Sequence, residues 1–136
     1  MADLKGSQTH ENMRQLFALE AQAHVRALYF AKIAEFEGHP ETARILREAA
    51  EALHLHADGH LDFLREVGDP LNDLPLGETA SNRQAHLATE QELVERLGTE
   101  MARTARGEGF PAIASWLETL GHVKQAHAAV LGEETE

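Results

Sequence analysis

The sequence predicts an all-α protein, a four-helix bundle in which a long crossover joins the second and third helices. Three observations favour this fold class. Apolar residues recur with a helical period in four segments. Glycine and proline separate the two members of each predicted helix pair. Between the pairs, residues 67–79 form a connector that is longer than the roughly 2–8 residues with which one helix turns back on the next.

Composition narrows the classes of protein that this chain can belong to. Its 136 residues suit a single domain spanning 1–136. With 12 Lys and Arg against 23 Asp and Glu, the net charge is −11, which argues against binding to nucleic acid or to anionic membranes. The lack of cysteine excludes disulfides, thiolate zinc sites and CxxC electron carriers. Because we find no apolar run of membrane-spanning length and no signal peptide, we expect a cytoplasmic protein.

The first helix is predicted at residues 9–37, with Thr9 as its N-cap. Its apolar stripe contains two polar residues, Glu20 and His24, which lie one turn apart. A carboxylate within an apolar stripe needs a partner, because an isolated buried charge is costly.

The second helix is predicted at residues 40–67, after Gly38 ends the first. Its core-facing side includes His56 and His60, and Leu53 lies on the same side. A histidine in such a place is a ligand, a hydrogen-bonded core residue, or a sign that the face has been assigned wrongly.

The third and fourth helices are predicted at residues 80–106 and 111–131. Polar residues again interrupt their apolar faces. These residues are His86 and Glu90 on the third helix, beside Leu93, and Lys124 and His127 on the fourth. The acidic residues after the fourth helix are expected to fray.

The two helix pairs repeat one another in sequence. The tetrapeptide EGHP, which ends at Pro40, recurs as EGFP 71 residues later, and the same offset carries His56 onto His127. It carries Glu20 to the position one residue past Glu90. The two hairpins therefore have equivalent faces if the third helix holds one extra residue, which a π-bulge would absorb.

One polar layer follows from this arrangement. Glu20, His56, Glu90 and His127 project from four different helices toward the centre of the predicted bundle. Two ways of compensating their charge are open. A divalent metal can bind two carboxylates and two imidazoles, a mixture that suits iron, manganese or zinc. Alternatively, Lys124 can pair with Glu20 or Glu90 while the histidines complete a hydrogen-bonded network.

The other polar residues near this layer are not predicted to be primary metal ligands. Either His24 or His86 can replace one of the four ligands, but each of them, like His60, is first expected to be a supporting or partly exposed group. The remaining histidines are expected to be solvated. They are His10, His39, His54 and His122.

Three segments carry a resemblance to a known family. They are LFALEAQAHVRALYFAKIAEFEG, AAEALHLHADGHLDFLREVGDPLNDLPLGETASN and EMARTARGEGFPAIASWLETL. In order and spacing, over nearly the whole chain, they resemble the rubrerythrin family of ferritin-like proteins. The resemblance implies a ferritin-like four-helix bundle with a dinuclear metal site, usually di-iron, that reduces peroxide or dioxygen. It also implies a homodimer, sometimes with exchanged helices.

The family's ligand pattern is a Glu on the first helix, E-x-x-H on the second, E-x-x-E on the third and E-x-x-H on the fourth. Glu20, His56, Glu90 and His127 match four of these positions. The departures are Leu53, Leu93 and Lys124, each of which stands where the family has a glutamate.

Two of the departures affect the metals directly. In the family's pattern, the glutamates at the positions of Leu53 and Lys124 bridge the two metals, whose repulsion is otherwise little offset. The sequence also contains no rubredoxin-like domain, so redox chemistry would need an external electron donor.

Three functions stay open at this point. The first is an oxidoreductase acting on peroxide or dioxygen through an altered site. The second is a binding protein that holds one metal for sensing, handling or structure. The third is a structural bundle in which Lys124 replaces a metal.

Overall fold

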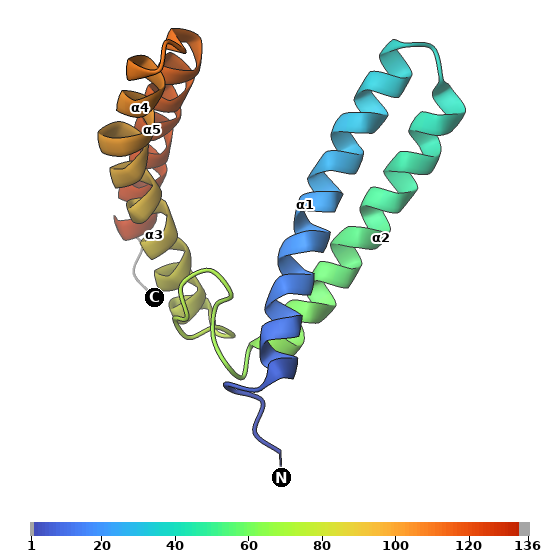
Figure 1. Ribbon diagram of the computed structural model, residues 1–136. Coiled ribbons are helices and arrows are strands. Elements are labelled where there is room, and N and C mark those ends of the chain that lie inside the picture. The colour runs from blue at the N-terminus through green and yellow to red at the C-terminus, as the bar shows by residue number, and fades with distance from the viewer. Residues whose placement is uncertain (1, 134–136) are drawn as a thin grey trace. The chain divides into compact units, whose positions relative to one another are not determined.

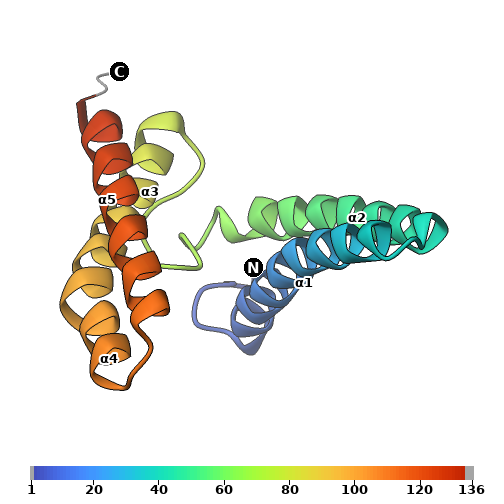
Figure 2. The ribbon, with the colours of Figure 1, turned by 90° about the horizontal axis from the view of Figure 1, so that it is seen from above.

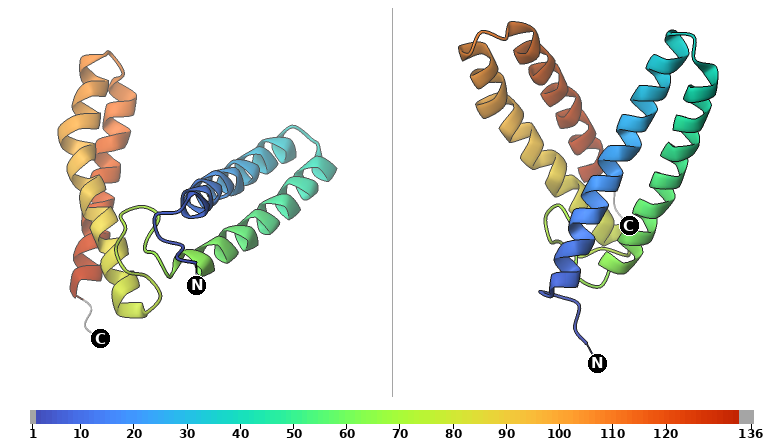
Figure 3. Two further views of the ribbon diagram at one scale, coloured as in Figure 1. Left: turned by 60° about the horizontal axis from the view of Figure 1, so that its bottom comes forward. Right: turned by 45° about the vertical axis from the view of Figure 1, so that its right-hand side comes forward.

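The first half of the protein is an antiparallel helical hairpin. The computed structural model describes residues 2–133. In it, α1 (Gln8–Phe36) and α2 (Pro40–Leu64) lie side by side in all views (Figures 1, 2 and 3). The N-cap of α1 is Ser7, whose hydroxyl accepts a 3.0 Å hydrogen bond from the backbone N–H of His10. The prediction of Thr9 as the cap was therefore wrong by two residues, because a serine preceding Thr9 already satisfies a free N–H of the first turn.

The second half is also an antiparallel hairpin. One member is a continuous helical segment made of α3 (Thr79–Arg96), the π-helix η1 (Leu97–Met101) and α4 (Ala102–Gly107). The other is α5 (Pro111–Glu133). The predicted all-α class, with four long helical segments, is confirmed for residues 2–133. Contacts divide the chain into one compact unit that ends at Pro70 and a second that begins at Leu71, so each hairpin is a unit by itself. That the two units form a single domain stays a prediction.

The sequence repeat is visible in the turns of the two hairpins. Gly38 and Gly109 both adopt a left-handed conformation, with φ of 84° and 88°. The following N–H groups then bond back to Ala34 and Ala105, both at 2.8 Å. This is the Schellman pattern that ends a helix, and it favours glycine because a Cβ is strained at positive φ.

The π-helix lies where the sequence repeat required an extra residue. Residues Leu97–Met101 follow Glu90 and precede Gly109, so the extra residue is absorbed between the two points that the repeat aligns. The predicted π-bulge is confirmed. It brings Glu90 into the position on its hairpin that Glu20 has on the other.

Small residues form the contact between the helices of each hairpin. Alanines are buried at matching places, for example Ala34 and Ala43 in the first hairpin and Ala105 and Ala114 in the second. Alanine lets two helix backbones approach closely but contributes little apolar area. Among the described residues, Leu64 is the only large side chain that is fully buried. Large apolar side chains instead remain exposed on each hairpin, including Leu28, Phe30, Ile33 and Phe63 on the first and Ile113, Trp116, Val123 and Val130 on the second.

An ion pair closes each hairpin near its turn. In the first, the guanidinium of Arg47 on α2 pairs with Glu35 on α1. In the second, Arg106 on α4 pairs with Glu118 on α5. Positions 35 and 106 are 71 residues apart, as are 47 and 118, so these are equivalent pairs. Their charges are reversed.

The connector between the hairpins is held by side chains. The amide of Asn72 donates to the carbonyl of Ala85 at 2.9 Å and to the hydroxyl of Thr89 at 3.0 Å. Earlier in the connector, the guanidinium of Arg14 donates to the carbonyl of Pro70 at 3.2 Å. Each end of the connector is therefore anchored to its own hairpin. No helix in the described part of the chain is both long and apolar enough to cross a membrane.

Candidate metal centre

The first hairpin holds its central carboxylate with two imidazoles. Glu20 projects from α1, and its side chain is 18% exposed. One oxygen accepts a hydrogen bond from Nδ1 of His56 at 2.8 Å, and the other accepts one from Nε2 of His60 at 3.0 Å. Both histidines come from α2, where a spacing of four residues puts them on the same side of the helix.

The two imidazoles favour the ionised form of this carboxylate. The hydrogen bond from His60 is the largest effect, and the bond from His56 adds to it, so the pKa of Glu20 lies below its ordinary value of 4.5 even though burial acts in the opposite direction. The sequence placed His60 among the supporting groups. The structure gives it a direct contact, and its side chain is only 16% exposed.

The second hairpin holds its central carboxylate with an ammonium group. Glu90 on α3 is buried, with a side chain that is 9% exposed. Nζ of Lys124 on α5 donates to both carboxylate oxygens, at 3.1 and 3.3 Å. His86 lies one turn before Glu90, with Nε2 at 3.9 Å from the same carboxylate, but its own side chain is 66% exposed. Of the two alternatives open for Lys124, the structure therefore shows the pairing with Glu90.

The other predicted residues lie around these two clusters. His127 is exposed on α5, and the departures Leu53 and Leu93 are half-buried. His24 is half-buried, and its Nδ1 lies 2.7 Å from the carbonyl of Ala50. A carbonyl can only accept, so this nitrogen carries the proton, and His24 acts as a hydrogen-bonded link between α1 and α2.

In the part of the chain that the structure describes, the donor groups of the two clusters do not form a metal site within either hairpin. Within residues 2–133, no three His, Asp or Glu side chains are arranged in a way that could hold a metal ion. The two central carboxylates are the groups with the chemistry of ligands, and each already has a basic partner in its own hairpin. A di-iron centre of the usual carboxylate-rich kind does not fit these residues, because Leu53 and Leu93 offer no donor atom and Lys124 is a cation.

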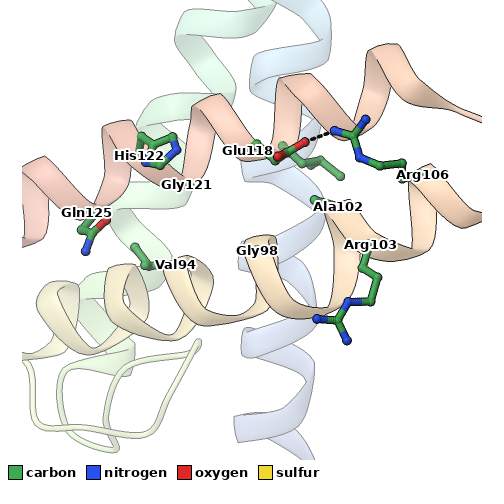
Figure 4. A pocket seen from close by; sticks show the side chains of 10 residues that line it. Val94, Gly98, Ala102, Arg103, Arg106, Glu118, Gly121, His122 and Gln125 are labelled. Carbon is green, nitrogen blue, oxygen red and sulfur yellow. Dashed lines mark hydrogen bonds and ion pairs between the residues drawn. The ribbon is translucent and has the colours of Figure 1, made fainter.

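The second hairpin also has a groove of mixed polar and apolar lining. It lies beside the π-helix, has a volume of about 470 Å³, and is bounded by Gly98 and Gly121, which offer no side chain to fill it (Figure 4). At its rim, Arg106 is paired with Glu118, while the side chain of Arg103 extends away from α5 (Figure 4). Neither Glu90 nor Lys124 lines the groove. The chemistry of a metal site therefore remains with the carboxylate clusters.

The fold and these clusters define a class of protein. Two helical hairpins, each with a carboxylate and basic partners in its central turns, are the elements of a ferritin-like helical bundle. Comparison with known proteins then narrows the class. The family model named Rubrerythrin matches residues 11–134.

Individual relatives agree with the family model. The chain is 31% identical to Rubrerythrin-1 of Clostridium acetobutylicum over 135 residues, which cover 93% of this chain and 69% of that protein. It is 34% identical to the rubrerythrin of Porphyromonas gingivalis over 128 residues, covering 91% and 64%. For the rubrerythrin of Nitratidesulfovibrio vulgaris the identity is 33% over 132 residues, covering 93% and 69%. The chain belongs to the rubrerythrin family, and it spans about two thirds of the length of these relatives.

Proposed function

We propose that this protein binds a divalent metal ion through Glu20, His56, Glu90 and His127. The observation that carries the proposal is the pair of little-exposed carboxylates, 18% for Glu20 and 9% for Glu90, at two ligand positions of the family's pattern. Each hairpin offers one carboxylate and one imidazole at equivalent positions of the repeat. Iron is the metal that the family implies, and manganese and zinc suit the same donors.

Metal analysis tests this proposal. Protein purified under gentle conditions should contain about one equivalent of metal per chain, and adding metal to the stripped protein should raise its melting temperature. The increase should disappear when His56→Ala and His127→Ala are combined, because both imidazoles are then lost. His122→Ala with His10→Ala is the matched control, since these two histidines lie outside the proposed ligand set. An equal increase in both double variants would contradict the ligand assignment.

A second candidate function is redox chemistry. Membership of the rubrerythrin family favours an oxidoreductase that acts on peroxide or dioxygen. The reconstituted protein should then consume hydrogen peroxide, and Glu20→Ala or His127→Ala should abolish this activity. Turnover equal to that of the same concentration of free metal would exclude the enzyme and leave the binding function. A structural bundle without metal predicts neither turnover nor an effect of metal on stability.

We also propose that the protein is a homodimer. Membership of the rubrerythrin family is what supports this proposal, since the family's resemblance implies a homodimer. Light scattering coupled to gel filtration should give a mass near twice the 15.0 kDa of one chain. A mass of 15.0 kDa across the micromolar range would contradict the dimer.

A further inference from the structure

We infer that this protein does not assemble a two-metal centre, and that the ammonium of Lys124 permanently takes the place of one of the two cations. The inference starts from the charge of Glu90. This carboxylate is buried, and both of its oxygens accept hydrogen bonds from Nζ of Lys124, at 3.1 and 3.3 Å. A carboxylate in that state already has the positive partner for which a metal would otherwise be needed.

The sequence repeat shows that the compensation is a property of each hairpin. At equivalent positions the hairpins share a carboxylate, Glu20 or Glu90, and an imidazole, His56 or His127. On its second helix, each hairpin then has one basic residue in hydrogen-bond contact with the carboxylate that the other hairpin lacks. In the first hairpin this is His60, whose equivalent 71 residues later is Leu131, and in the second it is Lys124, whose equivalent is Leu53.

In each hairpin this extra basic residue contacts the carboxylate directly, together with His56 in the first hairpin. His60 donates to Glu20 at 3.0 Å, and Lys124 donates to Glu90 at 3.1 Å. The two hairpins thus solve the same electrostatic problem with different residues, each from its own second helix. A cation shared between several carboxylates is not required for either of them.

A second metal ion would meet two obstacles in this chain. It would approach the ammonium of Lys124, a positive charge fixed against Glu90, in surroundings that screen the repulsion poorly. It would also lack bridging carboxylates, because Leu53 and Lys124 occupy those positions of the family's pattern. The protein therefore folds without metal and binds at most one divalent ion per chain. The limit of one ion rests on the proposed metal binding, whereas the replacement by Lys124 does not.

Metal stoichiometry in the full chain tests the inference. Stripped protein is dialysed against Zn²⁺ or, without oxygen, Fe²⁺, and bound metal per chain is measured by mass spectrometry while melting is followed by circular dichroism. Wild-type protein should melt cooperatively without metal and bind no more than one ion. Lys124→Glu should melt at a lower temperature without metal and should bind the ion at least tenfold more tightly, because a repelling charge becomes a ligand. Combining Lys124→Glu with Leu53→Glu and Leu93→Glu should raise the capacity to two ions. Lys32→Glu, the same charge change at an exposed site on α1, is the matched control and should leave affinity and capacity unchanged.

The outcomes separate this inference from the proposed function. Two ions bound by the wild-type protein would overturn the inference while the metal-binding function survives. No ion bound by the wild-type protein, with binding gained in Lys124→Glu, would refute the metal-binding function and support the inference. Equal metal affinity in wild type, Lys124→Glu and Lys32→Glu would overturn the inference. If the triple variant does not fold, two measurements still test the inference: the metal stoichiometry of the wild type, and the metal affinity of Lys124→Met compared with wild type. Removing the ammonium alone should tighten metal binding.

Discussion

Separating Lys124 from Glu90 should destabilise the protein strongly. At an effective dielectric constant of about 20, opposite charges at the observed 3.1–3.3 Å attract by roughly 5 kcal/mol. Part of this is offset by removing both groups from water, since their side chains are only 23% and 9% exposed. We therefore expect Lys124→Met to lower the free energy of unfolding by about 3 kcal/mol, mostly because Glu90 is left buried and unpaired. For a chain of this length, that corresponds to a decrease of about 10 °C in melting temperature.

A double-mutant cycle measures the pair itself. Lys124→Met, Glu90→Gln and the double variant are unfolded in urea at pH 7, after removal of metal and at one protein concentration, because an oligomer's stability depends on concentration. The double variant should lose less than the two single variants together, with a coupling energy of about 2 kcal/mol. Arg44→Met is the control, because Arg44 belongs to exposed pairs with Glu41 and Glu48 on α2, and its loss should cost far less than that of Lys124. A coupling energy below about 0.5 kcal/mol would refute the buried pair as the reason for the stability loss.

Three further predictions follow from individual contacts. Because the pKa of Glu20 is lowered in the folded state, Glu20 adds stability above its ordinary pKa of 4.5, and this stability is lost as the pH falls through the lower folded-state pKa. Acid unfolding of His60→Leu, monitored by circular dichroism, should therefore be less steep in that pH range than acid unfolding of the wild type. Identical acid transitions would contradict this. Gly121→Ala should raise the melting temperature measured by calorimetry by about 2–3 °C, because alanine favours the helix over glycine by about 0.5–1 kcal/mol. The added Cβ would lie 3.7 Å from its nearest neighbour, which is an ordinary contact distance. A lower melting temperature would mean that the glycine is required. Asn72→Ala should lower the free energy of unfolding in urea by about 1–3 kcal/mol, because the carbonyl of Ala85 loses a hydrogen-bond donor. Asn12→Ala, on the exposed side of α1, is the control and should leave the free energy of unfolding unchanged.

Much of the fold could be predicted from sequence because its signals are local or repeated. Gly38 and Gly109 end their helices through backbone geometry that depends on a few neighbouring residues. The π-helix could be predicted because the repeat fixes positions on both sides of it, at Glu90 and at Gly109, and leaves one residue too many between them. The N-cap at Ser7 was missed because several residues near the start of α1 can serve as caps, and sequence alone does not rank them.

The candidate site was less predictable because it depends on side-chain geometry. Spacing placed Glu20 and His56 near one another, and their hydrogen bond agrees with that. The contact of His60 with Glu20 was not expected, although its spacing of four residues from His56 is a signal that could have suggested it. Whether Lys124 would reach Glu20 or Glu90 depended on the length and direction of a flexible side chain, which periodicity does not specify.

The reversed ion pairs near the two turns carry a consequence for how the chain recognises its own halves. In duplicated hairpins with similar alanine contacts, α1 has two potential partners of similar shape, α2 and α5. Pairing with α5 would set Glu35 against Glu118 and leave Arg106 to meet Arg47, so two attractions would become two repulsions. Each exposed pair is worth only about 0.2–1 kcal/mol, but reversing two of them separates correct from mixed pairing by roughly 1–4 kcal/mol. The reversed charges of the two ion pairs thus favour pairing of each helix with its own hairpin partner. This preference is the same whether the competing helix comes from the same chain or from another copy.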